Sequence, residues 1–285
     1  MQQQKNILKK WLTGGQKYGK TILQTKQMRK EGIKMSMWNP TLVETSLNLR
    51  IERGHEAKDY KLSGNVAQSQ LKFAPDFICN CEDMEGCNSE EYDNALEDYV
   101  RVAATDDHQG RGVSCWVKRC YAVKKIFAMN APHFMHVLIT NDAGIKVNLL
   151  ILRILVSDSG IADFKARYAQ WQKAMRYLDS LADNPNIVMV GDWNHGVIAD
   201  TKSYRGKSRQ YFNFQMIEKS LLHRNIRMIN IPGYSFKGFM TIDHLAVSSL
   251  ISAKNARYED VHGTDVPEIG TPDHSFIVSE LRMCG

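Results

Sequence analysis

The sequence predicts an α/β domain of the α+β type, in which a pair of β-sheets pack face to face and helices cover their outer faces. Short apolar runs with β-type patterning recur along the chain and outnumber the helical segments. Strands and helices do not alternate regularly, as they do in a doubly wound parallel sheet. The chain has 285 residues, 43% of them hydrophobic, which is enough to bury one large core.

Strand-like segments follow one another from residue 41 onward, separated by turns. Alternating polarity or compact runs rich in β-branched residues predict strands over residues 41–51, 76–81, 146–156, 186–190, 241–249 and 274–283. The segments 112–118 and 121–127 are patterned like the two arms of a β-hairpin.

Helical periodicity is clearest between residues 161 and 183. Apolar side chains recur there every three or four residues, at Phe164, Tyr168, Trp171, Met175, Leu178 and Leu181. The sequence Asp183-Asn184-Pro185 then ends the pattern. We expect this helix, and a shorter one over residues 214–224, to pack one face against the core, and packing alone accounts for the aromatic residues.

Positive charge is concentrated before the first predicted strand. Residues 1–34 contain eight Lys, one Arg and one Glu, whereas the whole chain has a net charge of +6, so the remainder is slightly acidic. We therefore divide the chain into a basic extension, residues 1–40, and a domain over residues 41–285. One interpretation of the extension is a basic amphipathic segment that binds nucleic acid or an anionic membrane surface. Another is a solvated tail. A third is that translation starts at Met35 or Met37, so that the preceding residues are not part of the protein.

Three features of the sequence indicate the compartment. No run approaches the roughly 18 apolar residues of a membrane span, and the N-terminus lacks the apolar region and small-residue cleavage site of a secretory signal. The six cysteines show no paired disulfide framework. We expect a soluble, cytoplasmic monomer.

Polar side chains gather where the predicted strands begin or end. The run NIVMVGDWNHG, residues 186–196, places Asp192 and Asn194 directly after a buried strand. A G-D-x-N sequence alone is compatible with a local Asx turn. Similar positions are held by Asn48, Glu82, Asp243-His244 and Asp273-His274. Carboxylates and amides that meet at strand ends are the ligands that a hard cation needs.

The order of these motifs resembles the endonuclease/exonuclease/phosphatase superfamily, which includes the DNase I-like and exonuclease III-like phosphodiesterases. The match extends over residues 41–283, where an Asn, a Glu, GDWN, TIDHLAV and GTPDHSFIV follow one another in the family order. The RYAQ sequence within the helix 161–183 is similar to the R-x-x-Q helix that precedes the GDxN strand in the family. The resemblance implies a four-layered α/β/β/α sandwich of two mainly antiparallel sheets, with the site at one edge.

The resemblance also implies a bound divalent cation. It assigns Glu82 as the principal Mg²⁺ ligand, with Asn48 and Asp273 near the same ion, and Mn²⁺ is an alternative. Oxygen ligands of this kind suit a hard cation.

Four further residues receive catalytic roles from the resemblance. Asp192 orients or deprotonates the attacking water, and Asn194 donates a hydrogen bond to the phosphate. His274 contacts the scissile phosphate and is held by Asp243. These roles are physically coherent, because a carboxylate beside a histidine fixes the ring and favours the imidazolium form.

One position departs from the family pattern. Many members have a histidine, and others a tyrosine, on the strand before the helix, whereas this chain offers Arg153 or Ile154, depending on the register. Arg153 either replaces the missing group as a phosphate donor or faces outward. Arg111, between two glycines, and His195, after GDWN, are further candidates for substrate binding.

These assignments predict a Mg²⁺-dependent phosphodiesterase that acts on nucleic acid, with DNA as the expected substrate of an endonuclease or exonuclease. The basic extension favours a polyanionic substrate. An alternative is a phosphatase or phosphodiesterase of phosphoinositides, sphingomyelin or small phosphate esters, for which the extension would contact a membrane surface. A second alternative is a non-catalytic member that binds nucleic acid, and the presence of Glu82, Asp192 and His274 argues against it.

Overall fold

The computed structural model describes residues 37–102, 111–157, 160–181, 186–198, 210–259 and 268–284. The predicted basic extension lies outside these ranges except for its last four residues. Met37 and Trp38 belong to the folded domain, because they form strand β1 and pair with Cys284 and Met283 of the last strand. The domain therefore begins before residue 41, where the sequence placed its boundary.

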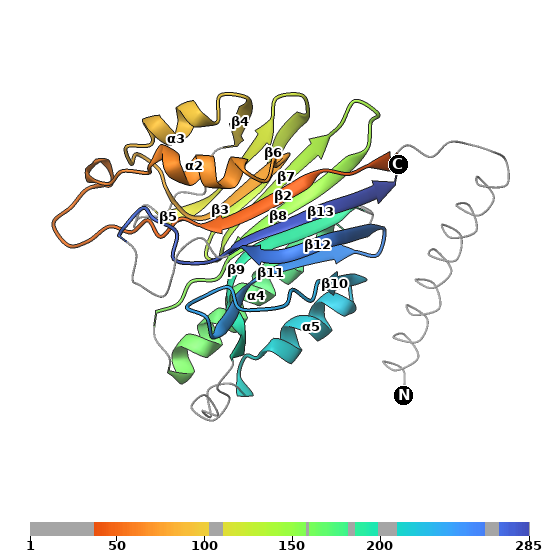
Figure 1. Ribbon diagram of the computed structural model, residues 1–285. Coiled ribbons are helices and arrows are strands. Elements are labelled where there is room, and N and C mark those ends of the chain that lie inside the picture. The colour runs from red at the N-terminus through yellow and green to blue at the C-terminus, as the bar shows by residue number, and fades with distance from the viewer. Residues whose placement is uncertain are drawn as a thin grey trace, which may run out of the picture. The chain divides into compact units, whose positions relative to one another are not determined.

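The described strands form two sheets (Figure 1). The first sheet contains β1 (Met37–Trp38), β2 (Thr41–Ser46), β3 (Phe77–Met84), β4 (Tyr99–Val102), β5 (Arg111–Lys118), β12 (Ile251–Glu259) and β13 (Phe276–Cys284). Within the described ranges its order is β1-β13-β2-β3-β5-β4, with β12 also paired to β13. The pair β2–β3 is parallel and the others are antiparallel.

The second sheet contains β6 (Ala122–Asn130), β7 (His133–Thr140), β8 (Lys146–Arg153), β9 (Ile187–Ile198), β10 (Ile226–Met228) and β11 (Met240–Ser248). In the described part of the chain its order is β10-β11-β9-β8-β7-β6. The pair β8–β9 is parallel and the remaining pairs are antiparallel. Both sheets are therefore mainly antiparallel.

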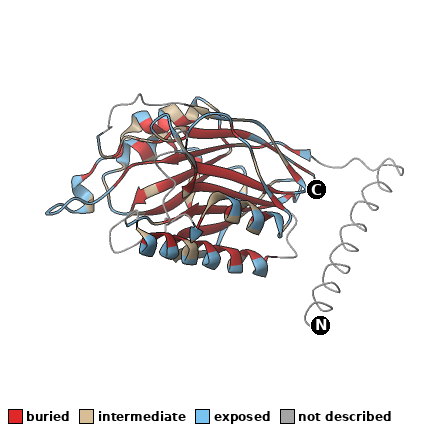
Figure 2. Cartoon of the chain, turned by 90° about the horizontal axis from the view of Figure 1, so that it is seen from below, coloured by how far each residue is buried: buried red, intermediate tan, exposed pale blue. Residues whose placement is uncertain are grey.

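Helices cover the outer face of each sheet (Figure 1). The first sheet carries η1 (Ala57–Asp59), α2 (Gly64–Leu71) and α3 (Glu90–Ala95), and the second carries α4 (Ile161–Ser180) and α5 (Phe214–Leu222). Figure 2 shows that the strands are mostly buried while the helices expose their outer sides. The four-layered sandwich is thus confirmed. None of the described helices is long and apolar enough to cross a membrane.

Strand β8 shows how the sequence pattern directs side chains in this fold. Leu149 and Ile151 point into the core between the sheets, whereas Leu150 and Leu152 pack in the core beneath α4. Because β8 is buried on both faces, its sequence is a continuous apolar run without alternation. The period of two places Arg153, its last residue, on the same side as Leu149 and Ile151.

The predicted hairpin over residues 112–127 is wrong. β5 lies between β3 and β4 in the first sheet, whereas β6 pairs with β7 at the edge of the second. The chain therefore crosses between the sheets at residues 119–121. β3 and β4 pair with the two edges of β5, so β6 cannot pair with it. The sequence pattern does not show which strands pair with each edge.

Several boundaries also differ from the predicted ones. β2 ends at Ser46 rather than at residue 51, β8 ends at Arg153, and α4 ends at Ser180. β9 continues to Ile198 instead of ending at residue 190. The GDWN segment consequently lies inside a strand that is paired with β11 on both sides of the segment, and not beyond the end of a strand.

Candidate active site

The predicted site residues converge on one cavity, although they come from seven strands or the turns next to them. The cavity has a volume of about 430 Å³. Its lining includes Asn48, Glu82, Arg111, Arg153, Asp192, Asn194, His195, Asp273 and His274. Asp243, the remaining predicted residue, is fully buried beneath it and is hydrogen-bonded to His274.

Backbone irregularities aim several of these side chains into the cavity. Asn48, Glu82 and Asn194 have positive φ angles of 52°, 55° and 47°. This conformation is unfavourable for a residue with a side chain, and least so for Asn. Glu82 lies where the pairing of β3 with β5 shifts register, as at a β-bulge. Residues held in such conformations cluster at functional sites, where the surrounding fold maintains them.

Two glycines allow β9 to pass close to its neighbours at the site. A Cβ atom on Gly191, which has a φ of 134°, would lie 2.3 Å from the carbonyl oxygen of Leu152. A Cβ atom on Gly196 would lie 1.7 Å from the carbonyl oxygen of Thr241. Any side chain would force the strands apart, so the glycines that flank D-W-N-H set the position of the acidic residue between them.

Asp192 is held by the backbone and side chain of Asn194. The Asn194 N–H donates to Asp192 Oδ1 at 2.9 Å, and Asn194 Nδ2 donates to Asp192 Oδ2 at 2.7 Å. The same Nδ2 also donates to the carbonyl oxygen of Ile154 at 2.8 Å. Both amide hydrogens of Asn194 are thereby engaged. In this arrangement Asn194 orients Asp192, which differs from the phosphate-donor role that the resemblance implied.

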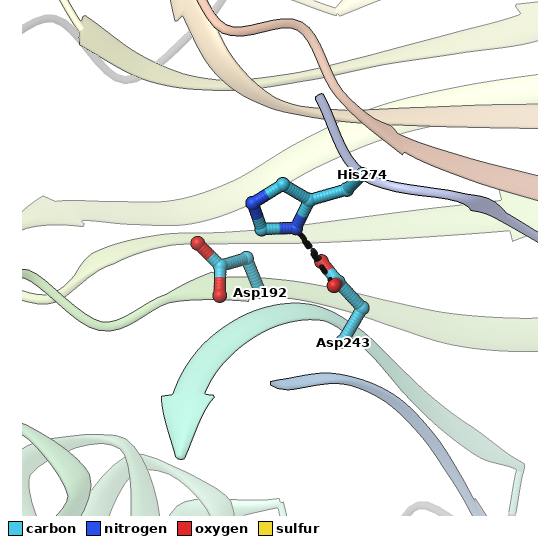
Figure 3. Close-up of side chains that lie close together, drawn as sticks. All are labelled: Asp192, Asp243 and His274. Carbon is cyan, nitrogen blue, oxygen red and sulfur yellow. Dashed lines mark hydrogen bonds and ion pairs between the residues drawn. The ribbon is translucent and has the colours of Figure 1, made fainter. Parts of the chain in front are cut away.

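His274 and Asp243 form a buried pair (Figure 3). His274 Nδ1 donates to Asp243 Oδ2 at 2.7 Å and lies 3.0 Å from Oδ1. The hydroxyl of Tyr258, on β12, donates to the carbonyl oxygen of Asp243, on β11, at 2.8 Å and so links the two strands. Burial alone would lower the pKa of His274, but the charges of Asp243, Asp192 and Asp273 and the hydrogen bond to Asp243 raise it to about 10. The ring is therefore an imidazolium. Its Nε2 lies 3.7 Å from Asp273 Oδ1, which is beyond hydrogen-bond distance, so the Nε2–H can donate to a ligand.

The protonation of Asp192 is shifted as well. Burial and the charge of Asp243 raise its pKa to about 7, against the opposing effects of His274 and Arg153. Ligand atoms of Asp192, Asp243 and His274 all lie within 4.8 Å of one another. An imidazolium cannot ligate a metal, so this trio is better suited to moving a proton than to holding an ion.

A different set of oxygen atoms fits a divalent cation. Asn48 donates through Nδ2 to the carbonyl oxygens of Glu268, at 3.4 Å, and Thr271, at 3.2 Å, which leaves its amide oxygen as a possible ligand. Asp273 Oδ1 is buried and accepts no hydrogen bond from the described residues. With the Glu82 carboxylate these atoms form an all-oxygen set of the kind that Mg²⁺ and Mn²⁺ prefer. The residues present therefore fit the implied metal.

The structure shows which residue stands at the position that departs from the family pattern. Arg153 faces the cavity and forms an ion pair through Nη2 with Glu82 Oε1, while its Nε lies 3.8 Å from Asp192 Oδ2. Ile154 packs into the core beneath α4. Arg111 approaches the same Glu82 oxygen at 3.6 Å. Two guanidinium groups therefore share the carboxylate that is predicted to bind the metal.

The two histidines that flank this region have packing roles. The His195 ring stacks on Phe212 with 4.6 Å between the ring centroids, and His195 also lines the cavity. Its carbonyl oxygen accepts a hydrogen bond from His244 Nε2 at 2.8 Å. Burial lowers the pKa of His244 to about 4, so that ring is neutral. His244 packs against Trp193, on the side of β11 that faces away from Asp243.

Three contributors were not predicted as site residues. Arg167, on α4, donates to the Asn194 carbonyl oxygen at 3.0 Å, and Gln170 bonds both the N–H and the carbonyl of Leu155. These two residues are the Arg and Gln of the R-x-x-Q pattern, and that pattern could have identified them from the sequence. Glu44 lies fully buried behind the site, and its carboxyl oxygens have no hydrogen-bond partner among the described residues. Burial and the charge of Asp243 raise the pKa of Glu44. An acidic residue inside an apolar strand is the feature of the sequence that could have identified it.

No protein-family model matches the sequence, and the search of curated proteins found no match. The fold, however, is similar to solved structures. An endonuclease/exonuclease/phosphatase from Beutenbergia cavernae superposes with a TM-score of 0.60 and 13% identity, covering 87% of this chain and 72% of that chain. ANGEL2, a 2′,3′-cyclic phosphatase in complex with adenosine-2′,3′-vanadate, gives a TM-score of 0.56 at 12% identity and covers 88% and 99%. TDP2 from D. rerio, complexed with a single-stranded DNA product, gives 0.53 at 9% identity and covers 85% and 98%.

These similarities confirm the resemblance at the level of the fold. The chain has the endonuclease/exonuclease/phosphatase, or DNase I-like, fold, and its polar cavity is built from the motifs by which the sequence resembles that superfamily.

Proposed function

We propose that the protein is a divalent-metal-dependent phosphoester hydrolase, and that its substrate is a phosphodiester of nucleic acid, with DNA as the leading candidate. One observation carries the proposal. A buried carboxylate with a pKa near neutrality, Asp192, and an imidazolium, His274, line the same cavity as an oxygen ligand set suited to a hard cation. A base for water, a donor for phosphate oxygen and a cation that offsets charge each accelerate phosphoester hydrolysis.

Glu82, Asn48 and Asp273 would hold the Mg²⁺ or Mn²⁺ ion. When bound, the ion offsets the negative charge of the phosphate and of the transition state. The chain's own groups perform the remaining tasks. Asp192, oriented by Asn194, accepts a proton from the attacking water, a contribution of roughly 10²–10⁴-fold.

His274 supplies a fixed donor close to Asp192 in the same cavity. Its Nδ1 is committed to Asp243, so its Nε2–H is the group that donates to a phosphate oxygen. The buried carboxylate keeps the ring charged and fixed in orientation, so the donor requires no rearrangement when the substrate binds.

Charge supports a polyanionic substrate. Besides its acids, the cavity is lined by Arg50, Arg111, Arg153 and Arg167. Two of the solved structures with the same fold contain nucleic-acid chemistry in their ligands, a vanadate of adenosine and a single-stranded DNA product. The basic extension adds positive charge that favours nucleic acid, although an anionic membrane would attract it as well.

A substrate panel tests the proposal. The full chain is incubated with supercoiled plasmid, single-stranded DNA, RNA, or vesicles that contain phosphoinositide or sphingomyelin, in Mg²⁺ or in EDTA. We expect Mg²⁺-dependent cleavage of DNA by the wild type and by His223→Asn, a surface control, and not by His274→Asn. Hydrolysis of the lipids alone would replace the nucleic-acid assignment. If folded protein hydrolyses none of the substrates, the enzymatic proposal fails.

A further inference from the structure

Arg153 places a permanent positive charge inside the cluster that is proposed to bind a cation. The residue ends β8, and its side chain is only 8% exposed. Its guanidinium joins Glu82 of the first sheet to Asp192 of the second. One side chain thus bridges the two sheets at the floor of the cavity and neutralises two carboxylates that would otherwise repel each other.

The position of Arg153 is fixed by its surroundings. The alternation along β8 turns it toward the first sheet, and the Ile154 N–H bonds the Asp192 carbonyl oxygen at 3.0 Å, which continues the pairing with β9 beyond the last residue of β8. Burial opposes the charge on Arg153, but Glu82 and Asp192 raise its pKa, so it remains a cation. Nothing in the described fold offers this guanidinium another pair of carboxylates.

Part of the hydrogen-bonding capacity of Arg153 is unused. Its Nε–H is buried and has no hydrogen-bond acceptor among the described residues, since Asp192 Oδ2 lies 3.8 Å away. A guanidinium has five donors in a planar fork that matches the oxygens of a phosphate. The same group can therefore hold carboxylates in one state and a phosphate in another.

Building on the proposed function, we propose that Arg153 is an internal counter-ion that competes with the divalent cation for Glu82 and binds the substrate phosphate once the cation has taken that carboxylate. The Arg153 guanidinium and the divalent cation are both positive and repel each other beside one carboxylate, so the presence of either one weakens the binding of the other. A phosphate relieves that repulsion because it accepts the displaced guanidinium. Metal and phosphate then bind cooperatively, and by linkage each raises the affinity for the other by the same factor.

Calorimetric titration with Mg²⁺ tests this directly, since it measures binding and not catalysis. The full-length wild type, Arg153→Gln, Arg153→Lys and Arg224→Gln are titrated with Mg²⁺ alone and with Mg²⁺ in the presence of inorganic phosphate. Arg224 pairs with Asp179 on the surface at 2.8 Å, so its variant controls for the loss of an arginine charge elsewhere.

We expect Arg153→Gln to bind Mg²⁺ at least about tenfold more tightly than the wild type, because a repelling charge is gone. Its Mg²⁺ affinity should no longer rise when phosphate is present. Arg153→Lys keeps the charge and should keep the weak affinity, and Arg224→Gln should match the wild type. Arg153→Met serves as a second variant if Arg153→Gln does not fold, as judged by circular dichroism.

Wild-type or weaker Mg²⁺ affinity in Arg153→Gln overturns the inference. Glu82→Gln separates this failure from failure of the proposed function. If the wild type binds Mg²⁺ and Glu82→Gln does not, the metal site stands and only the role of Arg153 is rejected. If neither the wild type nor Arg153→Gln binds Mg²⁺, both proposals fail together.

Discussion

At the scale of single residues, the site depends on how burial and neighbouring charges set protonation. Asp192 and His274 lie within the same small cluster, yet their pKa values move to about 7 and about 10. Asp243 contributes to both shifts, because its negative charge disfavours ionisation of Asp192 and favours the charged form of His274. A base and a donor can therefore coexist over a broad range of pH.

The sign of each shift fixes the expected pH profile. The base form of Asp192 increases as pH rises through about 7, and the imidazolium of His274 is lost as pH rises through about 10. We expect kcat/KM to rise through the first value, stay level, and fall through the second. Initial rates of diester hydrolysis from pH 5 to 11 measure this profile. A single ascending limb without a fall would contradict the assignment of His274 as donor.

Asp243→Asn should move both limbs to lower pH. It removes the charge that raises the pKa of Asp192 and the charge that keeps His274 protonated despite burial. Activity at pH 8 should drop while the circular dichroism spectrum remains that of the wild type. Full activity with unshifted limbs would show that Asp243 is not the partner on which His274 depends.

That these residues meet at one cavity was predictable, but their hydrogen bonds were not. Asp192 and Asn194 follow from a short motif that a single sequence displays. That both amide hydrogens of Asn194 are taken by Asp192 and Ile154 depends on a positive φ and on a carbonyl of the neighbouring strand. Neither this backbone conformation nor the position of that carbonyl can be read from the sequence around Asn194.

At the scale of elements, the contact of β9 with β11 positions the acidic motif. The pairing of these strands jumps between Thr241 and Asp243, and Gly196 lies against Thr241 at this irregularity. The register shift allows Asp243 to sit opposite Asp192. Strand pairing at this point therefore determines the distance between the two carboxylates.

Gly196→Ala should destabilise the protein by about 3 kcal/mol or more, because its Cβ would lie 1.7 Å from a backbone oxygen that cannot move without disrupting the sheet. Chemical denaturation measures the change. Gly144→Ala is a suitable control, since a Cβ there meets nothing within 4 Å and costs only about 1 kcal/mol for its positive φ. Equal effects of the two substitutions would refute the close approach.

The helices and strands differ in how well they could be predicted from the sequence. α4 was predictable because six apolar side chains recur at helical spacing before a proline. The partners of β5 and β6 were not predictable, because both segments have good strand patterns and those patterns do not show that β3 and β4 flank β5 while β6 pairs with β7. β12, with a half-exposed and irregular pattern, gave no clear signal.

At the scale of the whole molecule, the sandwich brings residues of seven strands, or of the turns next to them, to one cavity. The net positive charge of the sequence, in contrast, comes from residues 1–34. The layer order was predictable from the resemblance, since short motifs in a fixed order identify the fold even where overall identity is 9–13%. The role of residues 1–34 remains a prediction from composition, because these residues lie outside the described ranges.

Removal of residues 1–34 should weaken binding of DNA and reduce its dependence on salt, because those residues carry eight Lys and one Arg. Turnover of a small neutral-tailed phosphodiester should stay unchanged, since the cavity is built from residues 48–274. Fluorescence anisotropy at several salt concentrations measures the first effect. An unaltered salt dependence would mean that the extension does not contact nucleic acid.

The most direct test of the central claim is hydrolysis of bis(p-nitrophenyl) phosphate, in Mg²⁺ or Mn²⁺ and in EDTA, by the wild type, Asp192→Asn and the surface variant Asp179→Asn. We predict metal-dependent release of p-nitrophenol by the wild type and Asp179→Asn, and a rate about 10²–10⁴-fold lower for Asp192→Asn. Wild-type turnover by folded Asp192→Asn, or turnover indifferent to EDTA, would contradict the account of this cavity as a metal-dependent phosphoesterase site.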